Sequence, residues 1–270
     1  MNAFKEEISK RINDNEQNEE LIEAAYAFMK VSITPMYSYN FLWLGRPIIQ
    51  YPQDMVAMQE LIWKVKPDLI IETGIAHGGS LILSASMLAM IDYCEAAEAG
   101  ETLDPKTSRR KVLGLDIDIR GHNRAAIEAH PLAANIVMIQ GSSISPDIIA
   151  KVHDSAKDYE RILVCLDSHH THEHVFAELE AYAPLVSPGS YCVVFDTVIE
   201  DLPADMFPDR PWGKGNNPKT AVWEYLRRLE EERRTATDRT PLHFEIDKMI
   251  ENKLLISVAP DGYLKRIGGS

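Results

Sequence analysis

The stretch that most constrains the fold runs from Asp68 to Ser80, D-L-I-I-E-T-G-I-A-H-G-G-S. Apolar residues lead to an acid, and a glycine-rich turn then leads into the apolar run from Leu81 to Ile91. This order predicts a buried strand, a tight loop and the start of a helix. Glycines carry no Cβ, so such a loop can approach a ligand that faces the first N–H groups of the helix. We therefore expect a nucleotide-type cofactor at the edge of a parallel sheet, with glycines that serve only packing as the alternative.

The glycine loop fits the patterns of two cofactor families. Gly74, Ala76 and Gly79 match the loose G-x-G/A-x-x-G pattern of dinucleotide enzymes, so an NAD-dependent oxidoreductase stays an alternative. The acid at the strand end instead gives E-x-G-x-x-x-G over Glu72, Gly74 and Gly78, which resembles the first motif of class I S-adenosylmethionine (SAM)-dependent methyltransferases. In those enzymes the loop runs beneath the methionine part of the cofactor, and the acid helps to hold its charged end. The resemblance implies cofactor contacts at Glu72, Gly74, His77, Gly78 and Ser80.

The rest of the chain alternates between apolar strands and helical segments. Four further strands are predicted over residues 111–115, 136–140, 161–166 and 191–195, so the fold is expected to be a parallel, doubly wound α/β sheet. The tail predicts two more strands, in F-E-I-D and in L-L-I-S-V-A-P-D-G-Y-L-K-R, and the P-D-G turn suits a late antiparallel pair. A seven-stranded, mostly parallel sheet fits a methyltransferase better than a six-stranded dinucleotide domain.

Residues 1–66 are expected to form an N-terminal helical and aromatic extension, and residues 67–270 the methyltransferase domain. The segment Glu6 to Lys30 is predicted to be helical, with a break in the polar stretch Asn13 to Asn18. Between Pro35 and Pro47 the aromatic residues alternate, which predicts an extended segment with one aromatic face. This face would either pack on the core or wall the substrate site. The polar stretch at residues 95–110 is expected to be a surface insertion.

Composition excludes several classes of partner and compartment. The net charge is −13 and no dense Lys/Arg block occurs, so a nucleic-acid partner is not expected. The first residues contain no signal-peptide core, and the apolar run Leu81 to Ile91 is too short to span a bilayer. Three cysteines cannot all pair, and Cys165 and Cys192 fall in predicted core strands. We expect a cytoplasmic protein that acts on a small molecule or glycan and that forms a homo-oligomer.

Polar residues at two strand ends are candidates for the adenosine part of the cofactor. Asp116 ends the second strand, where an acid commonly accepts the ribose hydroxyls. In the dinucleotide pattern the acid follows the glycine loop by about 20 residues, and the insertion at residues 95–110 explains why Asp116 follows at a greater distance. Ser142 and Ser143 follow the third strand, where a small polar loop would meet the adenine. The alternatives are a turn aspartate and a helix cap.

Two acids predict a metal site at the same edge of the sheet. Asp167 and Asp196 each come directly after a buried strand, and the carboxyl ends of parallel strands meet at one edge. With Thr197 as an oxygen donor, these acids suit Mg²⁺ or Mn²⁺, and Asp167 would also border the cofactor. The alternative is a pair of aspartates that cap helices.

The four histidines His169, His170, His172 and His174 follow the first of these acids. Four histidines within six residues of a turn cannot all point inward, which argues against a zinc site. A histidine beside a metal-bound hydroxyl is better explained as a general base. His170, three residues after the acid, is the best placed, with His169 and His172 as the next candidates. His174 is expected on the solvated face of a helix over residues 172–182.

Together, E-T-G-I-A-H-G-G-S, G-L-D-I-D, L-D-S-H-H-T-H-E-H-V and V-V-F-D-T resemble the cephalosporin hydroxylase/rhamnosyl O-methyltransferase family. The resemblance covers roughly residues 36–267 and implies a SAM-dependent, metal-dependent O-methyltransferase that acts on a sugar or natural-product hydroxyl. It implies a cofactor site at Glu72, Gly74, Asp116 and Ser142, magnesium at Asp167 and Asp196, and His170 as the base. Some members carry a Glu-Asp pair at the end of the fifth strand, where this chain has Asp196-Thr197. If Thr197 replaces a carboxylate, the metal loses a charged ligand. A non-catalytic nucleotide-binding protein remains the alternative outside enzymes.

Overall fold

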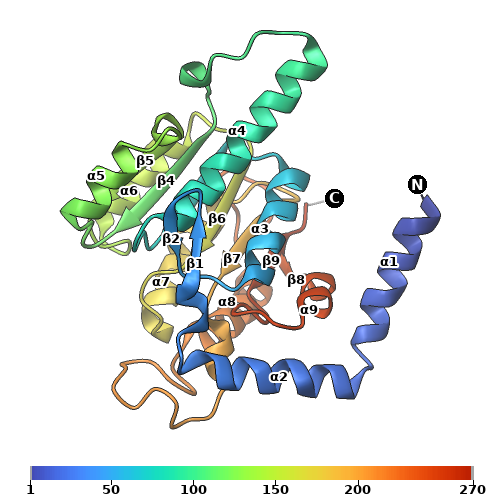
Figure 1. The fold of residues 1–270 in the computed structure, drawn as a ribbon. Coiled ribbons are helices and arrows are strands. Elements are labelled where there is room, and N and C mark those ends of the chain that lie inside the picture. Colours follow the sequence, from blue (N-terminus) through green and yellow to red (C-terminus); the bar gives the residue numbers. More distant parts are fainter. Residues whose placement is uncertain (1, 269–270) are drawn as a thin grey trace.

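The structure, a computed structural model, describes residues 2–268 and contains a seven-stranded, mostly parallel sheet between helices (Figure 1). The strand order is β5-β4-β3-β6-β7-β9-β8; the first five strands are parallel, and β9 is antiparallel to both of its neighbours. The predicted fold class is confirmed. The strands are β3 (Leu69–Thr73), β4 (Lys111–Asp116), β5 (Ile136–Gln140), β6 (Ile162–Leu166), β7 (Tyr191–Val194), β8 (Phe244–Ile246) and β9 (Tyr263–Arg266).

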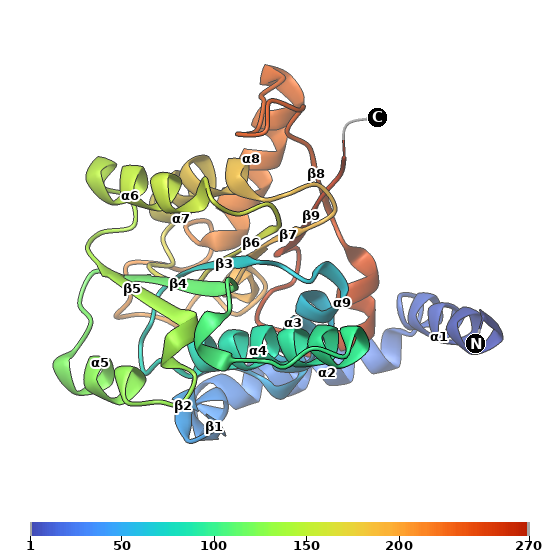
Figure 2. The same cartoon turned by 90° about the horizontal axis from the view of Figure 1, so that it is seen from above.

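Helices bury both faces of this sheet, which explains why its strands read as continuous apolar runs. One face packs on α3 (Pro52–Val65), α4 (Gly79–Ala99) and α5 (Gly121–Glu128), and the other on α6 (Pro146–Ala156), α7 (His172–Tyr182) and α8 (Pro218–Glu232) (Figure 2). Successive strand residues alternate between the two cores, because side chains in a strand point to opposite faces. In β3, Ile70 lies in the first core, whereas Leu69 and Ile71 lie in the second.

The strand order places a ligand crevice beside β3. From β3 the chain builds outward to β4 and β5, then returns to the other side of β3 and builds β6 and β7. Loops that leave the carboxyl ends of β3 and β6 therefore diverge, and ligands of open α/β sheets bind at such a point. The glycine loop after β3 and the acids after β4, β6 and β7 all lie at this edge.

The N-terminal segment differs in part from the predicted extension. The predicted break separates α1 (Asn2–Asn15) from α2 (Glu19–Ile33), where the Asn18 side chain caps α2 by accepting from Leu21 N. The aromatic stretch is extended only in the hairpin of β1 (Phe41–Trp43) and β2 (Arg46–Ile48), because η1 (Tyr37–Asn40) is a 3₁₀ turn. The proposed division at residue 66 stays a prediction.

Two boundaries were predicted wrongly, and tertiary contacts explain both. Helix α4 continues to Ala99, inside the expected insertion, where Arg110 forms ion pairs with Asp92 and Glu95 on that helix. In the tail, only the last four residues of the long predicted strand form β9, and residues 248–254 form α9 (Lys248–Leu254). The segment between them is held by the buried carboxylate of Asp54, which accepts from Ser257 Oγ and Val258 N.

Within the described residues, α4 is the one helix that is long and apolar enough to pass for a membrane span. This is weak evidence, because a core helix of a globular domain passes the same test. Leu81, Ile82 and Leu88 are fully buried in the protein, so this helix contributes to the core.

Candidate active site

A cavity of about 730 Å³ opens at the carboxyl ends of β3, β4, β6 and β7. Its size lies in the range of small-molecule sites. The strand-end loops supply polar groups on one side of the cavity. The other side is formed by two segments that are distant in sequence, the region around Met36 and Tyr39 and the loop between η5 (Thr197–Glu200) and α8. In the aromatic stretch, Tyr39 borders the cavity while Tyr37 packs edge-on against Phe28, with ring centroids 5.3 Å apart. Its expected role as a wall of the substrate site stays a prediction.

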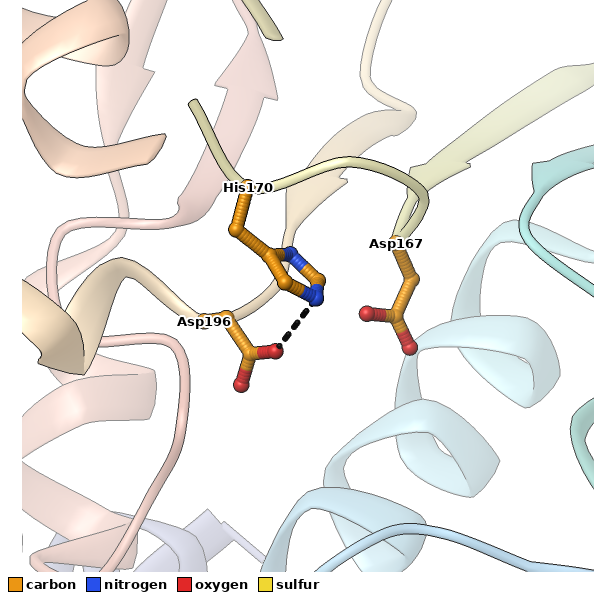
Figure 3. Close-up of side chains that lie close together, drawn as sticks. All are labelled: Asp167, His170 and Asp196. Atoms are coloured by element: carbon orange, nitrogen blue, oxygen red, sulfur yellow. Dashed lines mark ion pairs between the residues drawn. The ribbon is translucent and has the colours of Figure 1, made fainter. Parts of the chain in front are cut away.

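Asp167, His170 and Asp196 converge in this cavity (Figure 3). One potential ligand atom from each lies within 4.8 Å of the others, and His170 Nε2 is 3.1 Å from Asp196 Oδ2. Asp196 adopts a left-handed backbone conformation, φ 57° and ψ 20°, at the change from β7 to η5. Such a conformation costs energy for residues other than glycine, although aspartate tolerates it better than most, and such strain is concentrated at functional sites.

Thr197 does not join this cluster. Its side chain is fully buried, and its hydroxyl donates to Pro260 O at 2.6 Å. The predicted oxygen donor therefore faces the tail of the chain, and His170 takes the third place beside the two acids. Residue order alone did not show the direction of the Thr197 side chain.

The electrostatics of the cluster suit a divalent cation. Burial, followed by the negative charges of Asp196 and Glu72, raises the pKa of Asp167 well above its ordinary value. In the described part of the chain neither acid is paired with a lysine or an arginine, and Asp167 accepts only a long 3.4 Å hydrogen bond from the Gln50 amide among side chains. Two close carboxylates without a cationic partner are costly to bury. Oxygen ligands of this kind, with an imidazole beside them, fit Mg²⁺ or Mn²⁺.

Asp116 fastens the glycine loop and borders the cavity. Its Oδ2 accepts from Ile75 N at 2.9 Å and from Ala76 N at 3.3 Å, while Oδ1 accepts from Asp118 N. Ser142 and Ser143 also border the cavity, at the end of the neighbouring strand. The three residues predicted for the adenosine part thus lie together.

The glycines of the loop divide between the cavity and packing. Gly74 borders the cavity with φ +88°, and a Cβ there would lie 2.0 Å from Asp167 O, so only glycine fits. A Cβ on Gly78 would meet the Ile127 side chain, and one on Gly79 would meet Pro47 O, so these two glycines serve packing. His77 does not line the cavity either; its carbonyl accepts from the Arg46 guanidinium.

Glu72 lies behind the main cavity. It lines a second space of about 20 Å³ together with Ser80, and Gln50 and Asp167 border both spaces and so separate them. Glu72 is only 4% exposed, and this burial raises its pKa to about 7 although hydroxyls of Ser80 and Ser84 hydrogen-bond to it. Its expected contact with the charged end of a cofactor stays a prediction.

The other histidines separate into two groups. His172 is bound to α8, through Nδ1 to Thr220 Oγ1 at 2.8 Å and through Nε2 to Glu224 at 3.1 Å, so it does not line the cavity. His169 and His174 do border it, and burial together with nearby His174 lowers the pKa of His169.

The expectation that His174 lies on a solvated face is wrong. Its side chain is 18% exposed, with Nε2 3.1 Å from Ser143 Oγ and 3.4 Å from Glu178. Glu178, one turn later on α7, is fully buried, so this helix face points into the protein.

Sequence reasoning missed Gln50, Arg210 and Trp212, which also border the cavity. The Trp212 ring meets the His170 ring edge-on, with centroids 4.9 Å apart, and the Arg210 guanidinium lies over Trp212. A tryptophan within a proline-rich loop was the one available signal. The other two residues carry no motif.

Comparisons with known proteins agree on one family. The family model "Rhamnosyl O-methyltransferase/CmcI" matches residues 35–267. A rhamnosyl O-methyltransferase of Mycobacterium tuberculosis (strain H37Rv) is 27% identical over 85% of this chain and 82% of its own length, and that of Mycobacterium leprae (strain TN) is 28% identical over 85% and 87%. Two solved structures, CmcI-N160 in its apo form and CmcI-D160 with Mg and SAM, share the fold at TM-scores of 0.53 and 0.51, each with 16% identity. They cover 86% and 85% of this chain, which covers 78% of each.

Proposed function

Because this chain belongs to the Rhamnosyl O-methyltransferase/CmcI family, it is a SAM-dependent O-methyltransferase, and we propose that it methylates a sugar hydroxyl with the help of a divalent cation. The observation that carries the proposal is the cluster of Asp167, His170 and Asp196 in one cavity with the glycine loop. In the proposed arrangement Asp116, Ser142 and Ser143 bind the adenosine part of the cofactor. Asp167 and Asp196, with His170 beside them, hold Mg²⁺ or Mn²⁺.

In this proposal the chain supplies alignment and a base. When bound, the cation lowers the pKa of a hydroxyl and fixes its oxygen. The acceptor oxygen attacks the methyl carbon in line with the sulfonium, the carbon–sulfur bond breaks, and S-adenosylhomocysteine (SAH) leaves. The loop that Asp116 fastens holds the donor, and such alignment supplies much of the acceleration. His170 accepts the hydroxyl proton, and Asp196 Oδ2, 3.1 Å from Nε2, stabilises the imidazolium that results.

The first test is titration calorimetry with SAH and with NADH, followed by a methyl-transfer assay with rhamnosides in the presence of Mg²⁺. We expect SAH to bind at one site per chain, NADH to give no binding heat, and a rhamnoside to gain one methyl group. Binding of NADH without SAH would favour the oxidoreductase. Binding of SAH without transfer to any hydroxyl would favour the non-catalytic alternative.

Glu72→Gln is expected to weaken SAH binding by roughly 10-fold, the scale of one hydrogen bond to a charged group. We propose that the ionised Glu72 attracts the ammonium end of the cofactor across the partition formed by Gln50 and Asp167, which border both spaces. The measurement is the dissociation constant of SAH at pH 8, and an unchanged constant in the folded variant would contradict this placement.

The same variant has a signature in stability. Burial raises the pKa of Glu72 from 4.5 to about 7, so the folded state holds its proton more tightly than the unfolded state. The wild type should therefore lose stability as the pH rises from 4.5 to about 7, by on the order of 2–3 kcal/mol from this group. Glu72→Gln should lack that part of the slope in urea unfolding of the cofactor-free protein. Parallel pH profiles would show that Glu72 is not buried as described.

We place the enzyme in the cytoplasm. Cys94, Cys165 and Cys192 are all unpaired, and Cys165 and Cys192 are buried, which suits a reducing compartment. The expected homo-oligomer stays a prediction.

A further inference from the structure

Arg210 is the one lysine or arginine among the residues that line the main cavity. It lies in the loop between η5 and α8, drawn in orange in Figure 1. Its guanidinium forms no ion pair within the described residues, whereas the other ionisable groups that line the cavity include Asp116, Asp167 and Asp196. The chain as a whole carries a net charge of −13. The three carboxylates repel an anion, and Arg210 is the lining side chain whose permanent positive charge attracts one.

Trp212 connects this arginine to the reacting end of the cavity. Its ring centroid is 5.2 Å from Arg210 Cζ and 4.9 Å from the centroid of the His170 ring. The guanidinium and the imidazole are therefore separated by no more than about 10 Å. Stacking on an indole leaves the N–H donors at the edge of the guanidinium available, and these donors match phosphate and carboxylate oxygens.

We propose that Arg210 binds an anionic group of the acceptor, a phosphate or a carboxylate attached directly to the sugar that is methylated. The inference rests on the proposed function, because it takes the Asp167–His170–Asp196 cluster as the place of the reacting hydroxyl. A single sugar ring with an anionic substituent spans the gap between His170 and Arg210, with the Trp212 ring between them as an apolar wall. A glycan that lacked a charge on this ring would leave Arg210 without a partner.

The test compares three probes by titration calorimetry on protein saturated with SAH and Mg²⁺: α-L-rhamnose 1-phosphate, D-glucuronic acid and methyl α-L-rhamnoside. We expect one of the two anionic sugars to bind roughly 10- to 100-fold more tightly than the neutral one, the scale of a charge-assisted hydrogen bond. Preference for the phosphate would identify a sugar phosphate or nucleotide sugar, and preference for the acid would identify a uronic acid.

Arg210→Gln should abolish the preference for the anionic sugar, and Arg210→Lys should retain part of that preference. Lys214→Gln is the matched control, because Lys214 is an exposed cation of the same loop that does not line the cavity. In methyl-transfer assays the loss should appear in KM for the anionic sugar, with KM for the neutral sugar unchanged. If Arg210 only supported Trp212, the variant would weaken both kinds of sugar equally, and that result would overturn the inference.

The outcomes separate this inference from the proposed function. Equal binding and methylation of neutral and anionic sugars would leave the proposed function standing and would overturn the role of Arg210. If SAH binds but no sugar of either kind binds or is methylated, the sugar acceptor itself is wrong, and the inference fails with it.

Discussion

Asp167→Asn is expected to lower kcat/KM by roughly 10³-fold or more, the scale of several kcal/mol of transition-state stabilisation by a metal site. Asp167 supplies one of two carboxylates in the cluster, and its backbone packs directly against Gly74 of the glycine loop. The amide keeps the shape of the side chain and removes its charge. Loss of Mg²⁺ binding should accompany the loss of rate, and EDTA should produce the same loss in the wild type.

The same substitution should not lower the stability of the metal-free protein, although it lowers the rate. Burial and neighbouring negative charges raise the pKa of Asp167, so its ionised form costs stability at neutral pH in the absence of metal. The metal-free variant should therefore unfold at the same temperature as the wild type or at a higher one. Functional sites often keep like charges close together at a cost in stability, and the substitution removes one of those charges.

The measurements are metal titration, thermal unfolding without metal, and initial rates. Asp158→Asn, at an exposed acid before β6 that is not part of the cavity, should leave all three unchanged. Full activity of the wild type in EDTA, or unaltered Mg²⁺ affinity in Asp167→Asn, would refute the metal assignment.

Most of the sheet was predictable because of burial. Strands covered on both faces must be apolar throughout, so runs such as Leu69–Ile71 and Ile162–Leu166 stand out from their polar surroundings. Helices α3 and α8 begin at prolines, which also mark a helix start in sequence. The errors arose where side chains distant in sequence decide the conformation. In the tail, Ser257 and Val258 hydrogen-bond to the Asp54 carboxylate and do not pair with a strand.

The candidate site was predictable only in its strand-end acids. The three acids Asp116, Asp167 and Asp196 stand at the carboxyl ends of strands that were predicted to be parallel. Their convergence at one edge of the sheet therefore follows from topology alone. The direction of each side chain does not follow from topology. Thr197 hydrogen-bonds to Pro260 O instead of joining the cluster, and His174 borders the cavity instead of facing solvent. Trp212 and Arg210 border the cavity from a loop that carries no motif.

The second large effect is expected from His170→Ala, which should reduce kcat by roughly 10²–10⁴-fold, the usual scale of general base catalysis. The ring lies beside both acids, and Asp196 is placed to stabilise its protonated form. Added imidazole should restore part of the rate of the variant, because a free base can occupy the space that the ring leaves and accept the same proton.

Metal affinity decides between the two roles that the geometry allows for His170. If the residue is the base, His170→Ala should bind Mg²⁺ and SAH nearly as the wild type does, and only the rate should fall. A large loss of Mg²⁺ affinity would instead make His170 a metal ligand. His172→Ala is the matched control, because that ring is bound to Thr220 and Glu224 of α8; it should lower stability and leave kcat nearly unchanged. If His170→Ala is near wild type while His169→Ala is inactive, the base is His169, which also borders the cavity, and the assignment to His170 is wrong.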